Sequence, residues 1–191
     1  MDLTALVFSS GWASGVNAYA TVAVLGVIAR FTDTSIVPHA LGRTDVLVIA
    51  VAMFMVEFVV DKIPWLDSIW DGISTVVRPT VGAWVAWQLA GDSSGVDQAM
   101  LTALGGGTAL ASHGVKSGVR LAVNTSPEPF SNAIVSTTED VGVITVVSLA
   151  VAHPWWALSI TASLLVAGAA TVVLLWRTIS RARRRRRART P

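Results

Sequence analysis

The stretch that decides the fold is "VLVIAVAMFMV" at residues 46–56, followed directly by "EFVVDKIPWLDSIWDG" at residues 57–72. The first part is purely apolar, whereas the second gathers four carboxylates and one lysine between Glu57 and Asp71. An apolar run of this kind is typical of a helix that crosses a membrane. Charged groups in hydrocarbon are costly, so these carboxylates must face charged partners or water.

The composition of the whole chain predicts an all-α integral membrane protein. The chain has 191 residues, of which 53% are hydrophobic and 14% charged, and its mean hydropathy is +0.63. Soluble domains average about 25% charged residues. Because the sequence has no cysteine, disulfides, thiol nucleophiles and Cys-based metal sites are excluded. We interpret residues 1–178 as one polytopic membrane domain and residues 179–191 as an arginine-rich tail.

Six apolar segments are close to the roughly 20 residues that a membrane-crossing helix needs. They cover residues 3–31, 45–63, 66–90, 96–124, 131–152 and 155–177. Lys and Arg favour the cytoplasmic side, and the tail is strongly basic, so both termini are predicted to be cytoplasmic. Tryptophans, which favour membrane interfaces, lie near the expected inner ends (Trp65, Trp70, Trp176) and outer ends (Trp84, Trp87, Trp155, Trp156).

A short motif that occurs twice in the sequence predicts two inverted three-helix repeats, residues 1–90 and 96–178. "GWASGV" at 11–16 and "GVKSGV" at 114–119 share the pattern G-x-x-S-G-V, and each lies in a long segment interrupted by glycines. Inverted repeats whose first helices are broken at glycine are typical of transporters. A second interpretation stays open, because small residues also serve close helix packing and so short a match can arise by chance.

Helical spacing collects polar side chains into stripes on five of the six segments. The candidate substrate- or ion-binding residues are Asn17, Glu57, Asp61, Asp71, Arg78, His113, Lys116, Arg120, Asn132, Glu139 and Asp140. Buried structural ion pairs, helix caps and packing hydrogen bonds are alternative roles for them. No phosphate loop, HExxH or dinucleotide motif is present, so we predict no catalytic residue, metal or cofactor.

The arginine-rich tail predicts contact with lipid. Its cluster comprises Arg183, Arg184, Arg185, Arg186 and Arg187. Basic clusters beside a membrane-crossing helix attract anionic headgroups, and they also fix orientation. No aromatic residues alternate with these arginines, which argues against a nucleic-acid partner.

The polar segments resemble a bacterial membrane family known as domain of unknown function 4126. The resemblance rests on "ASGVNAY" (13–19), "DKIPWLDSIWDGISTVVRP" (61–79), "HGVKSGVRLAVNTSPEPFSN" (113–132) and "STTEDVG" (136–142). It covers the chain up to about residue 145 and leaves the last apolar segment and the tail outside. The resemblance implies a place in the bacterial cytoplasmic membrane and no established activity.

These features favour a small secondary transporter or translocase for an anionic substrate, such as a lipid phosphate. Arg78, Lys116 and Arg120 would bind the anionic group, and Glu57 or Asp61 would take up and release a proton. Two alternatives stay open: a metal-dependent membrane enzyme that acts on a lipid phosphate, and a structural or assembly protein. The sequence also leaves open the coupling ion and whether the chain forms a homo-oligomer.

Overall fold

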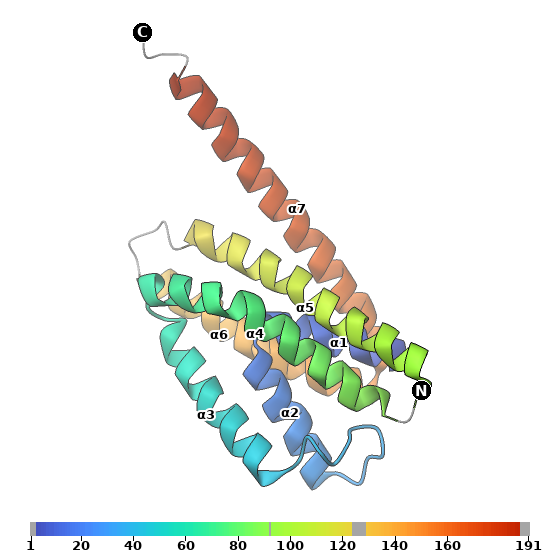
Figure 1. Ribbon diagram of the computed structural model, residues 1–191. Helices are drawn as coiled ribbons and strands as arrows, with labels where there is room; N and C mark the ends of the chain where they lie inside the picture. Colours follow the sequence, from blue (N-terminus) through green and yellow to red (C-terminus); the bar gives the residue numbers. More distant parts are fainter. Residues whose placement is uncertain (1–2, 92, 124–128, 188–191) are drawn as a thin grey trace.

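The chain is entirely helical in the part that the structure, a computed structural model, describes: residues 3–91, 93–123 and 129–187 (Figure 1). The predicted all-α class is therefore confirmed. The helices are α1 (Leu3–Val16), α2 (Ala18–Phe31), α3 (Thr44–Val60), α4 (Pro64–Ala90), α5 (Gly95–Val123), α6 (Pro129–Ala152) and α7 (Pro154–Arg187).

The first apolar segment, residues 3–31, is broken into two helices, and the break lies at another residue than the glycine expected. The chain breaks at Asn17, whose backbone is extended (φ −150°, ψ 103°) and whose side-chain oxygen accepts a hydrogen bond from the Ala20 N–H at 2.9 Å. Asparagine is a strong helix N-cap, so it starts α2 where a continuous helix would otherwise run on. The break lies at an asparagine, two residues beyond the glycine that the sequence pattern favoured.

No matching break occurs in the second predicted repeat. The helix α5 runs without interruption from Gly95 to Val123, through all of its glycines. Gly105, Gly106 and Gly118 pack closely against neighbouring helices, whereas nothing lies within 4 Å of a Cβ placed at Gly107 or Gly114, and the backbone around all of them stays helical. The two halves of the chain therefore begin differently, which gives the predicted repeat no support.

The helices α1 and α2 form a hairpin whose tip lies inside the bundle. Along α1, Gly11 approaches Gly105 and Gly15 approaches Ala109, so α1 runs parallel to α5. The helix α3 also runs parallel to α5, because its far end meets the last turns of α5. Late in α2, Gly26 packs on Leu47 near the start of α3. Thus α2 returns toward the end of the bundle from which α1 entered.

The helices α3 to α7 then run alternately in opposite directions (Figure 1). On α7, Gly168 packs against Val115 of α5, and one turn later Val172 packs against Gly118, so α7 is parallel to α5. The C-terminal part of α7 extends beyond the other helices, and the start of α1 and the end of α7 lie at opposite ends of the described structure (Figure 1).

Small residues hold α1, α4 and α5 in close contact. A Cβ atom added to Gly105 would lie 2.4 Å from the Ala86 Cβ and 2.8 Å from the Gly82 carbonyl oxygen on α4. On the α1 side, one added to Gly15 would lie 2.1 Å from the Ala109 carbonyl oxygen. Interfaces of this kind need residues without bulk. The small residues of "GWASGV" thus have a packing role.

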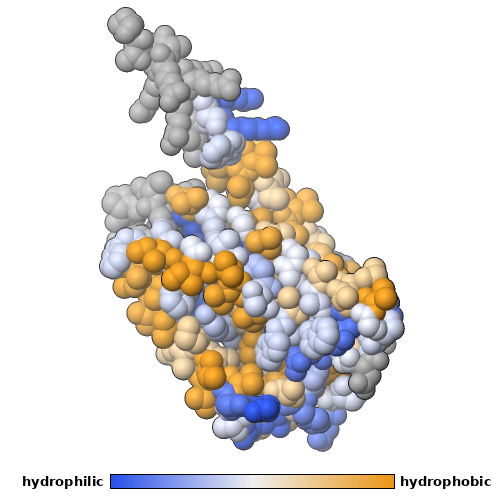
Figure 2. All heavy atoms as spheres, in the orientation of Figure 1, coloured by the Kyte–Doolittle hydropathy of each residue, from blue (hydrophilic) through white to orange (hydrophobic). Residues whose placement is uncertain are grey.

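Beside an apolar core, the interior holds large charged side chains, while many large apolar side chains are exposed. The largest fully buried side chains include Arg78, Arg120 and Glu57. Large apolar side chains are exposed along α3, α4, α6 and α7, and much of the face shown in Figure 2 is apolar. Among the described helices, α6 over residues 133–152 and α7 over residues 154–178 have the length and apolarity needed to cross a membrane.

We expect Gly105→Ala to lower the thermal stability of the purified protein, because its methyl group would overlap the backbone of α4. Overpacking of this kind costs about 1–3 kcal/mol. The matched control is Gly107→Ala, since nothing lies within 4 Å of the position of its Cβ. Alanine is the better helix former, so the control should be neutral or slightly stabilising. Equal effects of the two substitutions would contradict the close packing.

Candidate functional site

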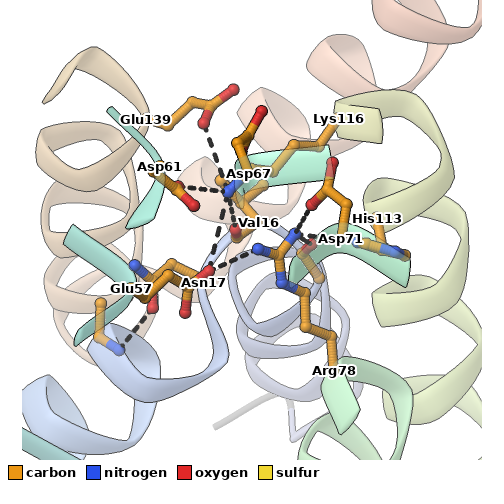
Figure 3. A network of polar contacts seen from close by, with 12 residues as sticks. Val16, Asn17, Glu57, Asp61, Asp67, Asp71, Arg78, His113, Lys116 and Glu139 are labelled. Atoms are coloured by element: carbon orange, nitrogen blue, oxygen red, sulfur yellow. Dashed lines mark hydrogen bonds and ion pairs between the residues drawn. The ribbon is translucent and has the colours of Figure 1, made fainter. Parts of the chain in front are cut away.

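A buried ion-pair network occupies the end of the bundle where α3 and α5 end and α4 begins (Figure 3). Its members come from α3, α4, α5 and α6 and from the turn after α3, and all except Glu139 are at least nine-tenths buried. The network comprises the bases Arg78, Lys116 and Arg120 and the acids Glu57, Asp61, Asp67, Asp71 and Glu139; a sixth acid, Asp140, lies beside them.

Arg78 connects α4 to α3 and to the tip of the hairpin. Its Nη2 atom lies 2.5 Å from Glu57 Oε1, and its Nη1 atom lies 3.5 Å from Asp71 Oδ1. The same Nη1 donates a hydrogen bond to the backbone carbonyl of Gly15 at 3.3 Å. A planar guanidinium suits this role, because it presents several donors in fixed directions.

Lys116 binds the end of α1. Its Nζ donates to the Val16 carbonyl at 2.9 Å and to Asp61 Oδ2 at 3.1 Å, and Glu139 Oε2 lies 3.4 Å away. The last carbonyls of a helix have no partner within the helix, and the helix dipole makes that end negative. Lys116 and Arg78 therefore satisfy carbonyls that the break at Asn17 leaves free.

Arg120 joins three elements at the same end. Its Nη2 lies 2.6 Å from Glu139 Oε2 on α6 and 3.3 Å from Asp61 Oδ2, and its Nη1 lies 3.6 Å from Asp67 Oδ1 on α4. It also donates to the backbone carbonyl of Asp61 at 3.1 Å. A single side chain thus fixes the positions of α4, α5 and α6 relative to the end of α3.

His113 is held as the neutral tautomer that carries its proton on Nε2. Its Nδ1 lies 2.9 Å from Arg78 Nη1, and because arginine can only donate, Nδ1 must accept. The Nε2–H then points to the Thr75 hydroxyl at 3.1 Å. His113 is accordingly neutral, and it connects Arg78 to the hydroxyl of the exposed Thr75 through hydrogen bonds.

Asp140 is bonded to the hairpin tip. Its Oδ1 accepts a hydrogen bond from the Asn17 side-chain amide at 2.9 Å. Within the described part of the chain its Oδ2 has no hydrogen-bond partner, and Asp140 makes no ion pair. It is 5% exposed, so a negative charge there has little access to water.

Two cavities reach the network from different sides. One, of about 220 Å³, lies between α4 and α5 and is lined by Asp71, Thr75, Ser117 and Arg120 among others. The second, of about 310 Å³, is bounded by α1, α5, α6 and α7, and its lining includes Trp12, Lys116, Glu139 and Leu164. Since Arg120 lines the first and Glu139 the second, their ion pair lies between the two cavities.

Ten of the eleven candidate residues come together at this end of the bundle, and the predicted contacts of Glu57 and Asp61 with the bases are confirmed. The eleventh, Asn132, has a side chain outside the described residues, as do Arg183–Arg187. Asp67, one of the four carboxylates expected to face charged partners or water, lies 3.6 Å from Arg120, although it was not among the binding candidates. Sequence analysis missed the carbonyls of Gly15 and Val16, which have no sequence signature.

Lys62 lies at the rim of this site. Its Nζ is 3.2 Å from the centre of the Phe58 ring and 3.4 Å from the Ser136 hydroxyl. Burial lowers the pKa of Lys62 below its ordinary value. The Lys62 side chain is half-buried, and its ammonium lies beside α6.

These observations define an all-helical protein with a folded-back N-terminal hairpin and a buried charge network at the hairpin tip. The chain belongs to the family described as domain of unknown function (DUF4126), whose model matches residues 4–175. The match includes most of α7, so the expectation that the similarity ends near residue 145 was wrong. No curated protein and no solved structure matches the chain.

A double-mutant cycle at Arg78 and Glu57 should reveal strong coupling. Arg78→Gln alone leaves a buried carboxylate without its partner, which costs about 3–5 kcal/mol of folding stability. Glu57→Gln in the same chain should recover part of that loss, as measured by denaturant unfolding.

The control cycle uses Arg43 and Asp45, an exposed ion pair at 2.7 Å. Exposed pairs contribute little, so this cycle should show almost no coupling. Additive effects at Arg78 and Glu57 would mean that the buried network does not hold the helices together.

Proposed function

We propose that this protein is a multi-pass membrane protein that works as a small, proton-coupled secondary transporter. The observation that carries the proposal is the hairpin tip at Asn17, which lies in a buried charge network reached by two cavities. Broken or re-entrant helices at polar sites are the usual means by which transporters bind ions within the membrane. Non-helical backbone at that depth is tolerated only where protein or a wet cavity surrounds it.

The exposed apolar side chains and the buried charges support a place in the membrane. In water, the exposed apolar surface of α3, α4 and α7 would be unfavourable, whereas lipid accommodates it. Charges within a bilayer face the interior and pair with one another, as Arg78, Lys116 and Arg120 do.

Two groups of exposed tryptophans support a bilayer of ordinary thickness. Trp155 and Trp176 lie near the two ends of the apolar part of α7. The 21 residue-to-residue steps from Trp155 to Trp176 correspond to roughly 32 Å of helix. This matches a hydrocarbon core of about 30 Å, and tryptophan favours both of its edges. Trp84 and Trp87 at the end of α4 are exposed at the level where α7 begins.

Five crossings and one re-entrant hairpin fit the helices better than six crossings. The helices α1 and α2 have 14 residues each, or roughly 21 Å, which is too short to cross. In the proposed arrangement they enter and leave on one side, and α3 to α7 cross. The basic C-terminus is then cytoplasmic and the N-terminus external, which revises the expected cytoplasmic N-terminus. The bacterial inner membrane remains the proposed location.

The charge balance favours a cationic passenger over the anion expected from sequence. Each of the three buried bases already faces at least one carboxylate. Among the described residues, six buried or nearly buried carboxylates stand against these three bases and Lys62 at the rim, so carboxylates outnumber the bases. The cavity with Trp12 and Glu139 offers an aromatic ring and a carboxylate, a combination that suits an organic cation once the passenger replaces Lys116, which also lines the cavity, as a partner of Glu139.

The two alternatives to a transporter, a structural or assembly protein and a metal-dependent enzyme, receive unequal support. A structural role is favoured by the dense pairing of the network, because buried ion pairs can fix how helices assemble. The metal-dependent enzyme receives none: in the residues that the structure describes, no group of three or more His, Asp or Glu side chains is placed to hold a metal ion.

Flux measurements in liposomes test the proposal. Purified protein should move ethidium across the vesicle membrane when a proton gradient is imposed, with proton movement reported by an entrapped pH-sensitive dye. Inorganic phosphate should not be carried. Arg120→Gln should abolish the flux, because it opens the pair between the two cavities. A folded protein that moves neither protons nor ethidium would favour the structural role, and phosphate flux would restore the anionic passenger.

A further inference from the structure

We propose that Asp140 is the proton-binding residue of this protein, and that its protonation acts on the α1–α2 hairpin through Asn17. The inference deepens the proposed function and rests on it for its consequence. It differs from the expectation drawn from sequence, which assigned the proton to Glu57 or Asp61.

Asp140 differs from the other five carboxylates by its lack of a counter-charge. Glu57, Asp61, Asp67, Asp71 and Glu139 each lie within ion-pair distance of Arg78, Lys116 or Arg120. In the described residues Asp140 has no such partner, although it is equally well buried, and its Oδ2 accepts no hydrogen bond. An unpaired charge in a dry place is costly, and a proton on Oδ2 removes it.

The surroundings of Asp140 are mixed in charge. Besides Glu139 on its own helix, the charged groups that act on it are Lys116 of α5, Asp61 at the end of α3 and Lys62 in the turn before α4. Lys62 also donates to Ser136, one turn before Asp140 on α6. In the described residues, charges of both signs therefore surround Asp140, and no base lies within ion-pair distance of it.

Asn17 couples the protonation of Asp140 to the α1–α2 hairpin. Its Nδ2–H donates to Asp140 Oδ1, while its Oδ1 caps the first turn of α2. Hydrogen bonds to an ionised carboxylate are about twice as strong as those to a neutral group. When Oδ2 takes a proton, no covalent bond breaks, but the bond from Asn17 loses its charge assistance. The strength of the hydrogen bond made by Asn17, at the helix break, therefore depends on whether Asp140 is ionised.

Infrared difference spectroscopy tests the proton site independently of transport. Between alkaline and acidic pH, the native protein should gain a carbonyl-stretch band from a buried, protonated carboxyl group. Asp140→Asn should abolish this band, and the matched variant Glu139→Gln, next in the chain, should keep it. Asp140→Asn should also fold with native or raised thermal stability, because it imitates the protonated state without leaving a base unpaired.

A thiol reporter tests the coupling to the hairpin. The chain has no cysteine, so Tyr19→Cys introduces a unique label two residues after the tip. Its maleimide labelling rate should depend on pH when Asp140 is present and lose that dependence in Asp140→Asn.

A band that persists in Asp140→Asn, or a variant that is strongly destabilised, would overturn the proposal. Loss of the band together with an absence of any flux in liposomes would retain the proton site and reject the transporter.

Discussion

The fold depends on two backbone carbonyls that have no helical partner. Asn17 ends α1 in the middle of the protein, and the carbonyls of Gly15 and Val16 are bonded there by Arg78 and Lys116. Buried carbonyls require donors, and cations are the strongest donors that a helix end can have. Once two cations are buried, carboxylates must accompany them. The buried charge network therefore follows from one break in one helix.

Close packing makes this arrangement geometrically feasible. Short contacts at Gly11, Gly15 and Gly105 bring α1 against α5, so that the side chains of α5 reach the end of α1. Buried ion pairs contribute little net stability, because desolvation offsets their attraction. Their value here lies in specificity, since Arg120 alone ties α6 to α4 and to the end of α3.

Sequence reasoning found the long helices because their apolar runs have clear lengths: the segment expected over 66–90 is observed as Pro64–Ala90, and that over 96–124 as Gly95–Val123. It failed at Asn17, because one polar residue scarcely changes the composition of an apolar run. The four-residue spacing of Glu57 and Asp61 predicted a shared face. Spacing within one helix cannot show which partner another helix supplies, so neither the choice of Arg120 as the partner of Asp67 nor the isolation of Asp140 was predictable.

The most direct test of the folded-back hairpin is the side of the membrane on which Thr4 lies. Single cysteines can replace Thr4 on α1, Ser94 in the turn before α5 and Thr178 on α7, and a membrane-impermeant maleimide can then be applied to intact cells. Thr4→Cys and Ser94→Cys should both be labelled from outside, while Thr178→Cys should react only after permeabilisation. If Thr4→Cys behaved like Thr178→Cys, residues 3–31 would cross the membrane as one segment, and the hairpin would be refuted.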